Sequence, residues 1–201
     1  WSFSNASGSI TNQVANDTIA ANLDTGGSYN DLTRGPGATP SSANSSFRTT
    51  GFQNNGIDVA NTDYFQFIMS AASGYSLSLS GISGAFAGTA TYSAAPGVSH
   101  QWGYSLDGTN FTLIGSAVAR IANGTSDFDF SGTAALQNVA AGTDVTLRYY
   151  ATGQTTTGGW GFSSAGLDVN GTLNVIPEPS VLALLAIGGL AIVRFVRRRD
   201  A

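Results

Sequence analysis

Cysteine and lysine are absent from the 201 residues of this chain, and histidine occurs once, as His100. Without cysteine the chain can form no disulfide, no thiolate metal site and no cysteine nucleophile. A Ser-His-Asp triad would have to use His100, and no Gly-x-Ser-x-Gly turn lies near this residue. We therefore expect a protein without enzymatic activity, in which His100 is a structural or surface residue that alanine can replace without loss of the fold.

Charge is sparse, and its sign differs between the two parts of the chain. Residues 1–174 contain ten Asp and four Arg, a formal charge of −6, whereas residues 175–201 contain four Arg against Glu178 and Asp200, a formal charge of +2. Phosphate binding needs clustered cations, which the acidic body does not have. We therefore expect no nucleic-acid partner.

The body, residues 1–174, is long enough for one domain with a core. It is rich in Gly, Ser, Thr and Asn, and no window sustains an apolar helical stripe over three turns. Strand patterns recur at short spacing, in residues 63–70, 75–82, 99–106, 110–115, 127–130, 144–151 and 160–173, with residues 1–4 as a further candidate. Recurring strands without alternating helices predict an all-β, antiparallel β-sandwich of jelly-roll-like type.

The connections between these strands differ in the strength of their signals. Residues 71–74 form a connection of hairpin length, and Asp107-Gly108 is a strong hairpin signal between two further strands. Residues 5–62 have few apolar anchors, so we expect long loops there with two to three edge strands. Residues 134–139 are compatible with one short helical turn.

Period-two alternation predicts which side chains enter the core. In residues 127–130 it places Phe128 and Phe130 inward and both Asp127 and Asp129 toward solvent. In residues 144–151 it places Tyr149 and Tyr150 on opposite faces, so one tyrosine should be exposed. The predicted core residues are Phe65, Phe67, Leu77, Leu79, Phe128, Phe130, Val145 and Leu147.

Two kinds of ligand site remain open as alternatives. Aromatic rings flanked by Asn, Asp or Gln can bind sugars, and the candidate contacts are Trp102, Tyr104, Tyr150 and Trp160, although each ring also suits the core. Calcium could use Asp58 and Asp63 within the Asn- and Asp-rich residues 54–63, but no EF-hand spacing is present. Turn formation explains that stretch without a metal, so no cofactor is expected, with calcium kept as the alternative.

The last 27 residues differ in character from the body. Residues 181–193 are all apolar or Gly, and a helix over about residues 180–196 would span roughly 24 Å, which is a short transmembrane helix. The basic cluster at its end consists of Arg194, Arg197, Arg198 and Arg199. Positive charge on this end predicts that the end is cytoplasmic and that the body lies outside the cytoplasm.

The order of Pro177-Glu178-Pro179, an apolar helix and a terminal Arg cluster resembles the PEP-CTERM sorting signal of Gram-negative bacteria that make exopolysaccharide. The resemblance covers residues 175–201. It implies that an exosortase, a membrane-embedded cysteine protease, recognises Pro177, Glu178 and Pro179 and removes the helix. By this resemblance the precursor is anchored in the inner membrane before the body reaches the cell surface or the extracellular matrix.

The function expected from these features is that of an exported surface or extracellular-matrix protein associated with exopolysaccharide in biofilm or floc. The alternative is a calcium-supported carbohydrate-binding module, and an exported hydrolase ranks last. The chain starts at Trp1 and its one Met is Met69. This start indicates either a removed export leader, which we favour, or a fragment.

Overall fold

A computed structural model describes residues 1–3, 19–41, 43–52, 56–89, 96–153 and 158–177 of the chain. These residues form two antiparallel sheets and, as the one helical element among them, the 3₁₀ turn η1 (Ala134–Leu136). The all-β, antiparallel prediction is confirmed, and so is the short turn within residues 134–139. The first sheet contains β1 (Thr33–Arg34), β3 (Tyr64–Met69), β10 (Val145–Thr152), β5 (Val98–Ser105) and β6 (Thr112–Leu113) in this order, and β7 (Val118–Arg120) also pairs with β5.

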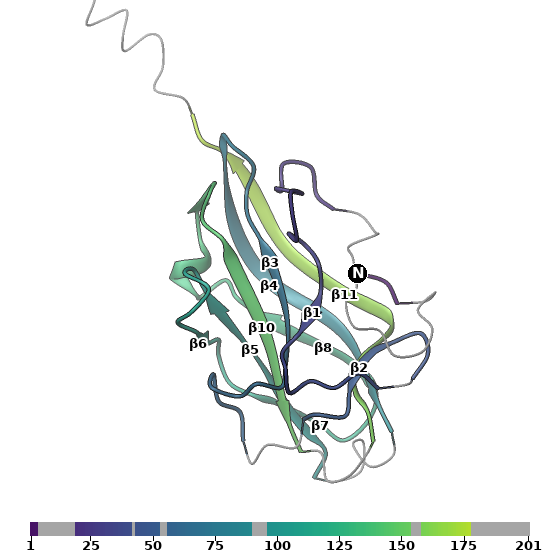
Figure 1. Cartoon of the computed structure of the whole chain (residues 1–201). Helices are drawn as coiled ribbons and strands as arrows, with labels where there is room; N and C mark the ends of the chain where they lie inside the picture. The colour runs from purple at the N-terminus through teal and green to yellow at the C-terminus, as the bar shows by residue number, and fades with distance from the viewer. Residues whose placement is uncertain (4–18, 42, 53–55, 90–95, 154–157, 178–201) are drawn as a thin grey trace, which may run out of the picture.

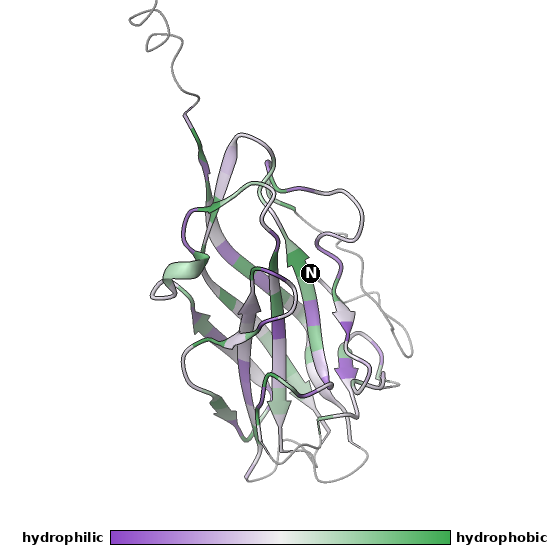
Figure 2. Ribbon diagram, turned by 60° about the vertical axis from the view of Figure 1, so that its left-hand side comes forward, coloured by the Kyte–Doolittle hydropathy of each residue, from purple (hydrophilic) through white to green (hydrophobic). Residues whose placement is uncertain are grey.

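The second sheet contains β2 (Phe47–Thr49), β11 (Trp160–Val175), β4 (Tyr75–Gly88) and β8 (Gly124–Asp129) in this order, and β9 (Val139–Ala140) also pairs with β4. The two sheets lie face to face as a β-sandwich (Figure 1). Along β8, Phe128 faces the interior while Asp127 and Asp129 are exposed, as the alternation predicts. Figure 2 shows the same change between apolar and polar residues along the longer strands.

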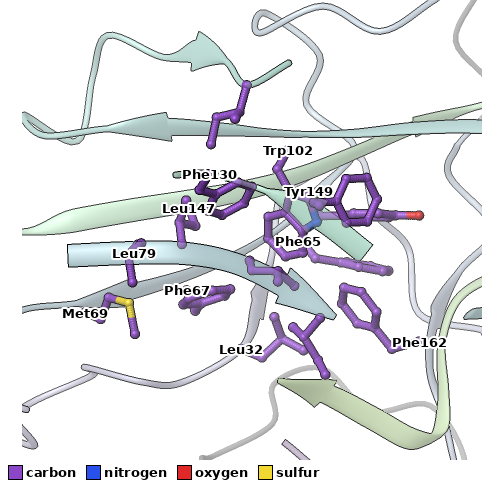
Figure 3. Packing of buried hydrophobic residues seen from close by; sticks show 14 of the residues in the cluster. Leu32, Phe65, Phe67, Met69, Leu79, Trp102, Phe130, Leu147, Tyr149 and Phe162 are labelled. Carbon is purple, nitrogen blue, oxygen red and sulfur yellow. The ribbon is translucent and has the colours of Figure 1, made fainter. Parts of the chain in front are cut away.

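The core between the sheets is aromatic. All eight side chains predicted to lie in the core are buried, none more than 8% exposed. Phe65 lies near the centre, with its ring 4.9 Å from that of Phe47 and 5.4 Å from that of Phe162, which belong to the opposite sheet (Figure 3). Burial of each Phe side chain stabilises the fold by about 1.5–3 kcal/mol, so the packing of these rings is the main interaction that holds the two sheets together.

The chain alternates between the two sheets as it passes through β2, β3, β4, β5, β8, β10 and β11 in turn. The hairpin expected at residues 71–74 is therefore wrong, because β3 and β4 belong to different sheets. Four residues are enough to cross the roughly 10 Å between packed sheets. The hairpin at Asp107-Gly108 is confirmed: β5 pairs with β6, and Gly108 has the positive φ of 72° that this turn requires.

The part of the chain before residue 62 contributes short strands at sheet edges. β1 lies on the edge of the first sheet and β2 on the edge of the second, which agrees with the expectation of two to three edge strands. Residues 1–3 are not a strand, but Trp1 exchanges two backbone hydrogen bonds with Leu167 of β11, of 2.7 and 3.0 Å. Phe3 is fully buried, so this end of the chain belongs to the fold.

Candidate functional site

The predicted sorting motif begins where the sandwich ends. β11 finishes at Val175, and the Ile176 N–H donates to the carbonyl oxygen of Gly74 at 2.8 Å. Pro177 is the last residue described, and it directly follows this bond at one tip of the sandwich (Figure 1). Glu178, Pro179 and the rest of the motif lie outside the described residues, including the helix expected at 180–196 and the four arginines of the basic cluster.

Within the part of the chain that the structure describes, no helix is long and apolar enough to cross a membrane.

His100 lies on β5 in the interior of the sandwich and is fully buried. Its Nδ1 is 2.8 Å from the Tyr149 hydroxyl, and its Nε2 is 3.3 Å from the Ser126 hydroxyl. Arg120 donates from Nη1 to the same Ser126 oxygen at 2.9 Å. A neutral imidazole has one donor and one acceptor nitrogen, and the two hydroxyl groups can serve either tautomer. The arrangement therefore holds a neutral His100 in place.

The electrostatic surroundings of His100 agree with this geometry. Burial, and secondly the positive charge of Arg120, lower the pKa of His100 to about 3. Because the ring is buried and engaged at both nitrogens, it has no free face for a substrate. The expectation that alanine can replace His100 without loss of the fold does not agree with this burial, since the replacement would leave a cavity and unpaired polar atoms.

Three of the four candidate sugar contacts are wrong. Trp102, Tyr150 and Trp160 are each 0% exposed, so their rings cannot stack on a sugar. Trp102 and Trp160 face the core, where the sandwich needs large apolar side chains. Tyr104 is half-buried and packs against the same core. The sequence left this core role open for Trp102, Tyr104 and Trp160, and the structure selects it.

Tyr150 is buried although it points away from the core. The prediction that either Tyr149 or Tyr150 is exposed is therefore wrong. The reason is a loop laid over the outer face of the first sheet, since the Tyr150 hydroxyl donates to the carbonyl oxygen of Val59 at 3.3 Å. The ring of Tyr64 adds an edge contact at 6.1 Å. Alternation within one strand cannot predict that a loop from a distant part of the chain buries an outward-facing side chain.

The candidate calcium ligands differ in their surroundings. Asp58 is exposed, and its carboxylate accepts the Ala60 N–H at 2.8 Å, which is the turn role expected from the composition. Asp63 is buried. Among the described residues, no group of three His, Cys, Asp or Glu side chains could hold a metal ion. Calcium binding at Asp58 and Asp63 stays a prediction.

A hollow that the sequence did not predict lies along the open side of the sandwich. We call it the edge groove, and it runs between β11 and residues 19–23. One part, of about 330 Å³, lies between Trp1, Asn30 and Asp168. The adjoining part, of about 300 Å³, has Leu77 and Leu79 among its lining residues. The part beside Trp1 is lined about equally by polar and apolar atoms, and the part beside Leu77 and Leu79 mainly by apolar atoms.

The edge groove depends on contacts between residues far apart in the sequence. Trp1 closes one end by its bonds to Leu167 and by donating from Nε1 to the Asn30 carbonyl oxygen at 2.9 Å. Its ring also packs on Phe67 at 4.6 Å. The sequence signal that could have indicated this site is the length of the pattern at residues 160–173, which exceeds that of every other strand in the body.

No protein-family model and no curated protein sequence matches this chain. Among solved structures, a mutant of Xylanase10C from Cellvibrio japonicus in complex with xylopentaose is similar, with a TM-score of 0.33 and 12% sequence identity. The similar region covers 88% of this chain and 29% of that one, so this chain spans less than a third of the xylanase. A similarity of this size assigns neither a fold family nor an activity.

Proposed function

We propose that this chain is an exported, non-enzymatic surface or extracellular-matrix protein that an exosortase sorts through a PEP-CTERM-like signal. Its body is a jelly-roll-type sandwich that associates with exopolysaccharide in biofilm or floc. The observation that carries the proposal is the order of Pro177-Glu178-Pro179, an apolar run and a terminal Arg cluster at the C-terminal end of an all-β body.

Each part of the signal has a physical task in this proposal. The helix at about residues 180–196 holds the precursor in the inner membrane, and the basic cluster keeps its end cytoplasmic. Pro177 and Pro179 disfavour helix at the outer interface, so the segment around Glu178 stays extended for a membrane protease. The last strand ends at Val175, so the folded body would stand directly outside the membrane during cleavage.

The distribution of aromatic rings supports a structural role for the body. Among the described residues, every aromatic side chain is buried or half-buried, and Trp102 and Trp160 are fully buried. A lectin-like module would instead present two or more exposed rings on a concave face. The outer face of the second sheet is polar, with Asp168, Ser83 and Asp127 in one row across β11, β4 and β8. Such a face suits weak hydrogen bonding to hydrated polysaccharide.

The experiment for the sorting proposal is the intact mass of the protein from its native cells. We expect the mature protein to lack the segment from about Pro179 onward. Glu178→Gln should leave membrane insertion unchanged and keep the full-length mass. Asp200→Asn is the matched control, because it removes an acidic charge from the tail outside the motif and should be cleaved normally. An uncleaved C-terminus in cells that contain an exosortase would show that the tail is a plain anchor.

The carbohydrate-binding alternative needs a separate measurement. Purified exopolysaccharide from the same cells should retard the protein in affinity electrophoresis only weakly, and equally with calcium or with a chelator. Tight, saturable retardation that calcium enhances would instead favour the binding module. Asp58→Asn would then show whether the predicted calcium ligand takes part.

A further inference from the structure

One edge of the C-terminal half of β11 has no strand paired with it among the residues that the structure describes. β4 occupies the other edge along its whole length, and the Trp1 bonds show that Leu167 directs its backbone groups away from β4. Alternate residues of a strand point to the same edge, so Val169, Gly171, Leu173 and Val175 point the same way as Leu167. No hydrogen bond joins the outward backbone groups of these four residues to the described part of the chain.

This open edge differs from a neighbouring edge of the sandwich. Along β3, the loop of residues 24–30 covers the outer edge, since the Asp24 and Asn30 N–H groups donate to the carbonyl oxygens of Ser70 and Ile68. Proteins protect edges that stay exposed with Lys, Pro or inward charges. Residues 169–175 contain no charged residue and no Pro. The stretch therefore lacks the charged and proline residues that keep an edge from pairing, and its one irregularity is a register shift against β4 between Asn170 and Gly171.

We propose that this edge pairs with the same edge of a second copy of the chain. The pairing is antiparallel and two-fold symmetric, with Thr172 opposite the Thr172 of the other copy. The two second sheets then continue into one sheet across the dimer. This inference goes beyond the proposed function and does not depend on the sorting signal.

The side chains along the edge are complementary in this register. Val169 lies opposite Val175, and Leu173 lies opposite Gly171, which leaves room for its side chain. Asn170 and Asn174 face each other in the same way on the polar face. Because residues 169, 171, 173 and 175 pair only with one another, every outward N–H and C=O of the stretch finds a partner.

The register also explains where the pairing stops. The next outward residue toward the N-terminal end of the stretch is Leu167, whose backbone groups Trp1 already occupies. Its counterpart in the second copy would be Pro177, which has no N–H to donate. The pairing therefore extends over residues 169–175, which is also the length of the edge that Trp1 leaves free.

Charge and apolar exposure favour the same contact. Among the described residues that flank the stretch in the chain, Asp168 is the one with a charged side chain. Its counterpart position is Ile176, so the two Asp168 lie about 26 Å apart. Salt screens charges at that separation. Val175 and Ile176 are adjacent exposed apolar residues, with exposed fractions of 67% and 43%. In the dimer the apolar side chains of one edge lie beside the edge groove of the other copy.

Cross-linking can test the register, because the chain contains no cysteine. In the full chain, kept in mild detergent because of residues 181–193, a single Thr172→Cys should oxidise to a disulfide-linked dimer. Residues in a non-hydrogen-bonded antiparallel pair have Cα atoms about 4.5 Å apart, within the range for a disulfide. Thr125→Cys is the matched control, another exposed threonine, on β8, and should stay at least about tenfold less cross-linked.

Charge pairing gives a second measurement. Thr172→Lys and Thr172→Glu should each weaken dimerisation by about fivefold in analytical ultracentrifugation, because like charges would face each other. An equimolar mixture of the two variants should restore the dimer. The proposal is overturned if the wild-type chain is monomeric, if Thr125→Cys cross-links as well as Thr172→Cys, or if mixing restores nothing. Cross-linking through Leu173→Cys instead of Thr172→Cys would overturn the register.

Discussion

Tyr149 of β10 and Trp160 of β11 join the two sheets by a hydrogen bond, in which the indole Nε1 donates to the phenol oxygen at 2.8 Å. The same oxygen lies 2.8 Å from Nδ1 of His100. All three side chains are fully buried. One hydroxyl group thus serves two polar atoms that water cannot reach.

Replacing Tyr149 by phenylalanine should therefore destabilise the fold. The ring stays, but the indole N–H and a nitrogen of His100 lose a partner, which costs about 1–3 kcal/mol of unfolding free energy. Guanidinium unfolding followed by tryptophan fluorescence measures the change. Tyr64→Phe is the control, because its hydroxyl makes no hydrogen bond with the described residues, and it should change stability by less than about 0.5 kcal/mol. Equal effects in the two variants would contradict the role of Tyr149.

Stability should fall in mild acid because of His100. Its pKa is about 3 in the folded protein, lowered mainly by burial, against an ordinary 6.5 in the unfolded chain. Between these values the unfolded chain binds the proton first, so stability is complete above about pH 6.5 and is lost as the pH falls toward 3. The expected slope is about 1.4 kcal/mol per pH unit, or roughly 2 kcal/mol between pH 6.5 and 5.

Unfolding titrations at several pH values between 7 and 5 test this slope. His100→Gln cannot titrate in this range, so its stability, although lower, should be nearly independent of pH. Since the chain has one histidine, the difference between the two slopes isolates this residue. Identical slopes in the wild type and the variant would mean that His100 does not control acid stability.

Gly161 should not tolerate a side chain. It has a φ of +154° and pairs with Arg48 of β2, and a Cβ would collide with the carbonyl oxygen of Phe47. Gly161→Ala should cost about 2–4 kcal/mol of unfolding free energy. Gly108→Ala, at a φ of +72° in open space, is the control and should cost about 1 kcal/mol. A Gly161→Ala variant as stable as the control would show that β2 can move away.

The basic cluster should control the topology of the precursor. In the proposed precursor these arginines hold the end of the helix on the cytoplasmic side, so replacing Arg197, Arg198 and Arg199 with Gln should let a fraction of the chains insert in the opposite orientation. Protease added to spheroplasts measures this, because a correctly oriented body is accessible from outside. Arg120→Gln, which changes the charge in the body alone, should leave orientation unchanged. Full accessibility in the triple variant would contradict this role of the cluster.

Local patterns in the sequence predicted much of the fold. The alternation of Phe128 and Phe130 with Asp127 and Asp129 is visible within four residues, and the structure confirms it. The Asp107-Gly108 turn is equally local, because its backbone conformation depends on one glycine. Residues 71–74 form a short connection, as predicted, but they join strands of different sheets and not a hairpin. A short segment can make either connection, so its length does not decide between them.

The candidate site residues were harder to place, because burial of an aromatic ring depends on what covers it. Trp102 and Trp160 suit either a core or a sugar platform by their chemistry, and only the opposing sheet decides for the core. Tyr150 points outward as its strand predicts, and the loop at Val59 buries it. The role of His100 likewise depends on Tyr149 and Ser126, which lie on other strands.

By itself, the sequence determined the class of the body, whereas the sorting role of its tail stays a prediction. Strand propensity, period-two alternation and turn residues act over a few neighbours, so an all-β sandwich follows from composition and pattern. The tertiary structure alone decided that β11 runs past β2 and Trp1 to an open edge, and that His100 is enclosed and neutral. Both depend on pairing between distant segments, where each residue's partner is set by the packing of the whole core and not by its neighbours in the chain.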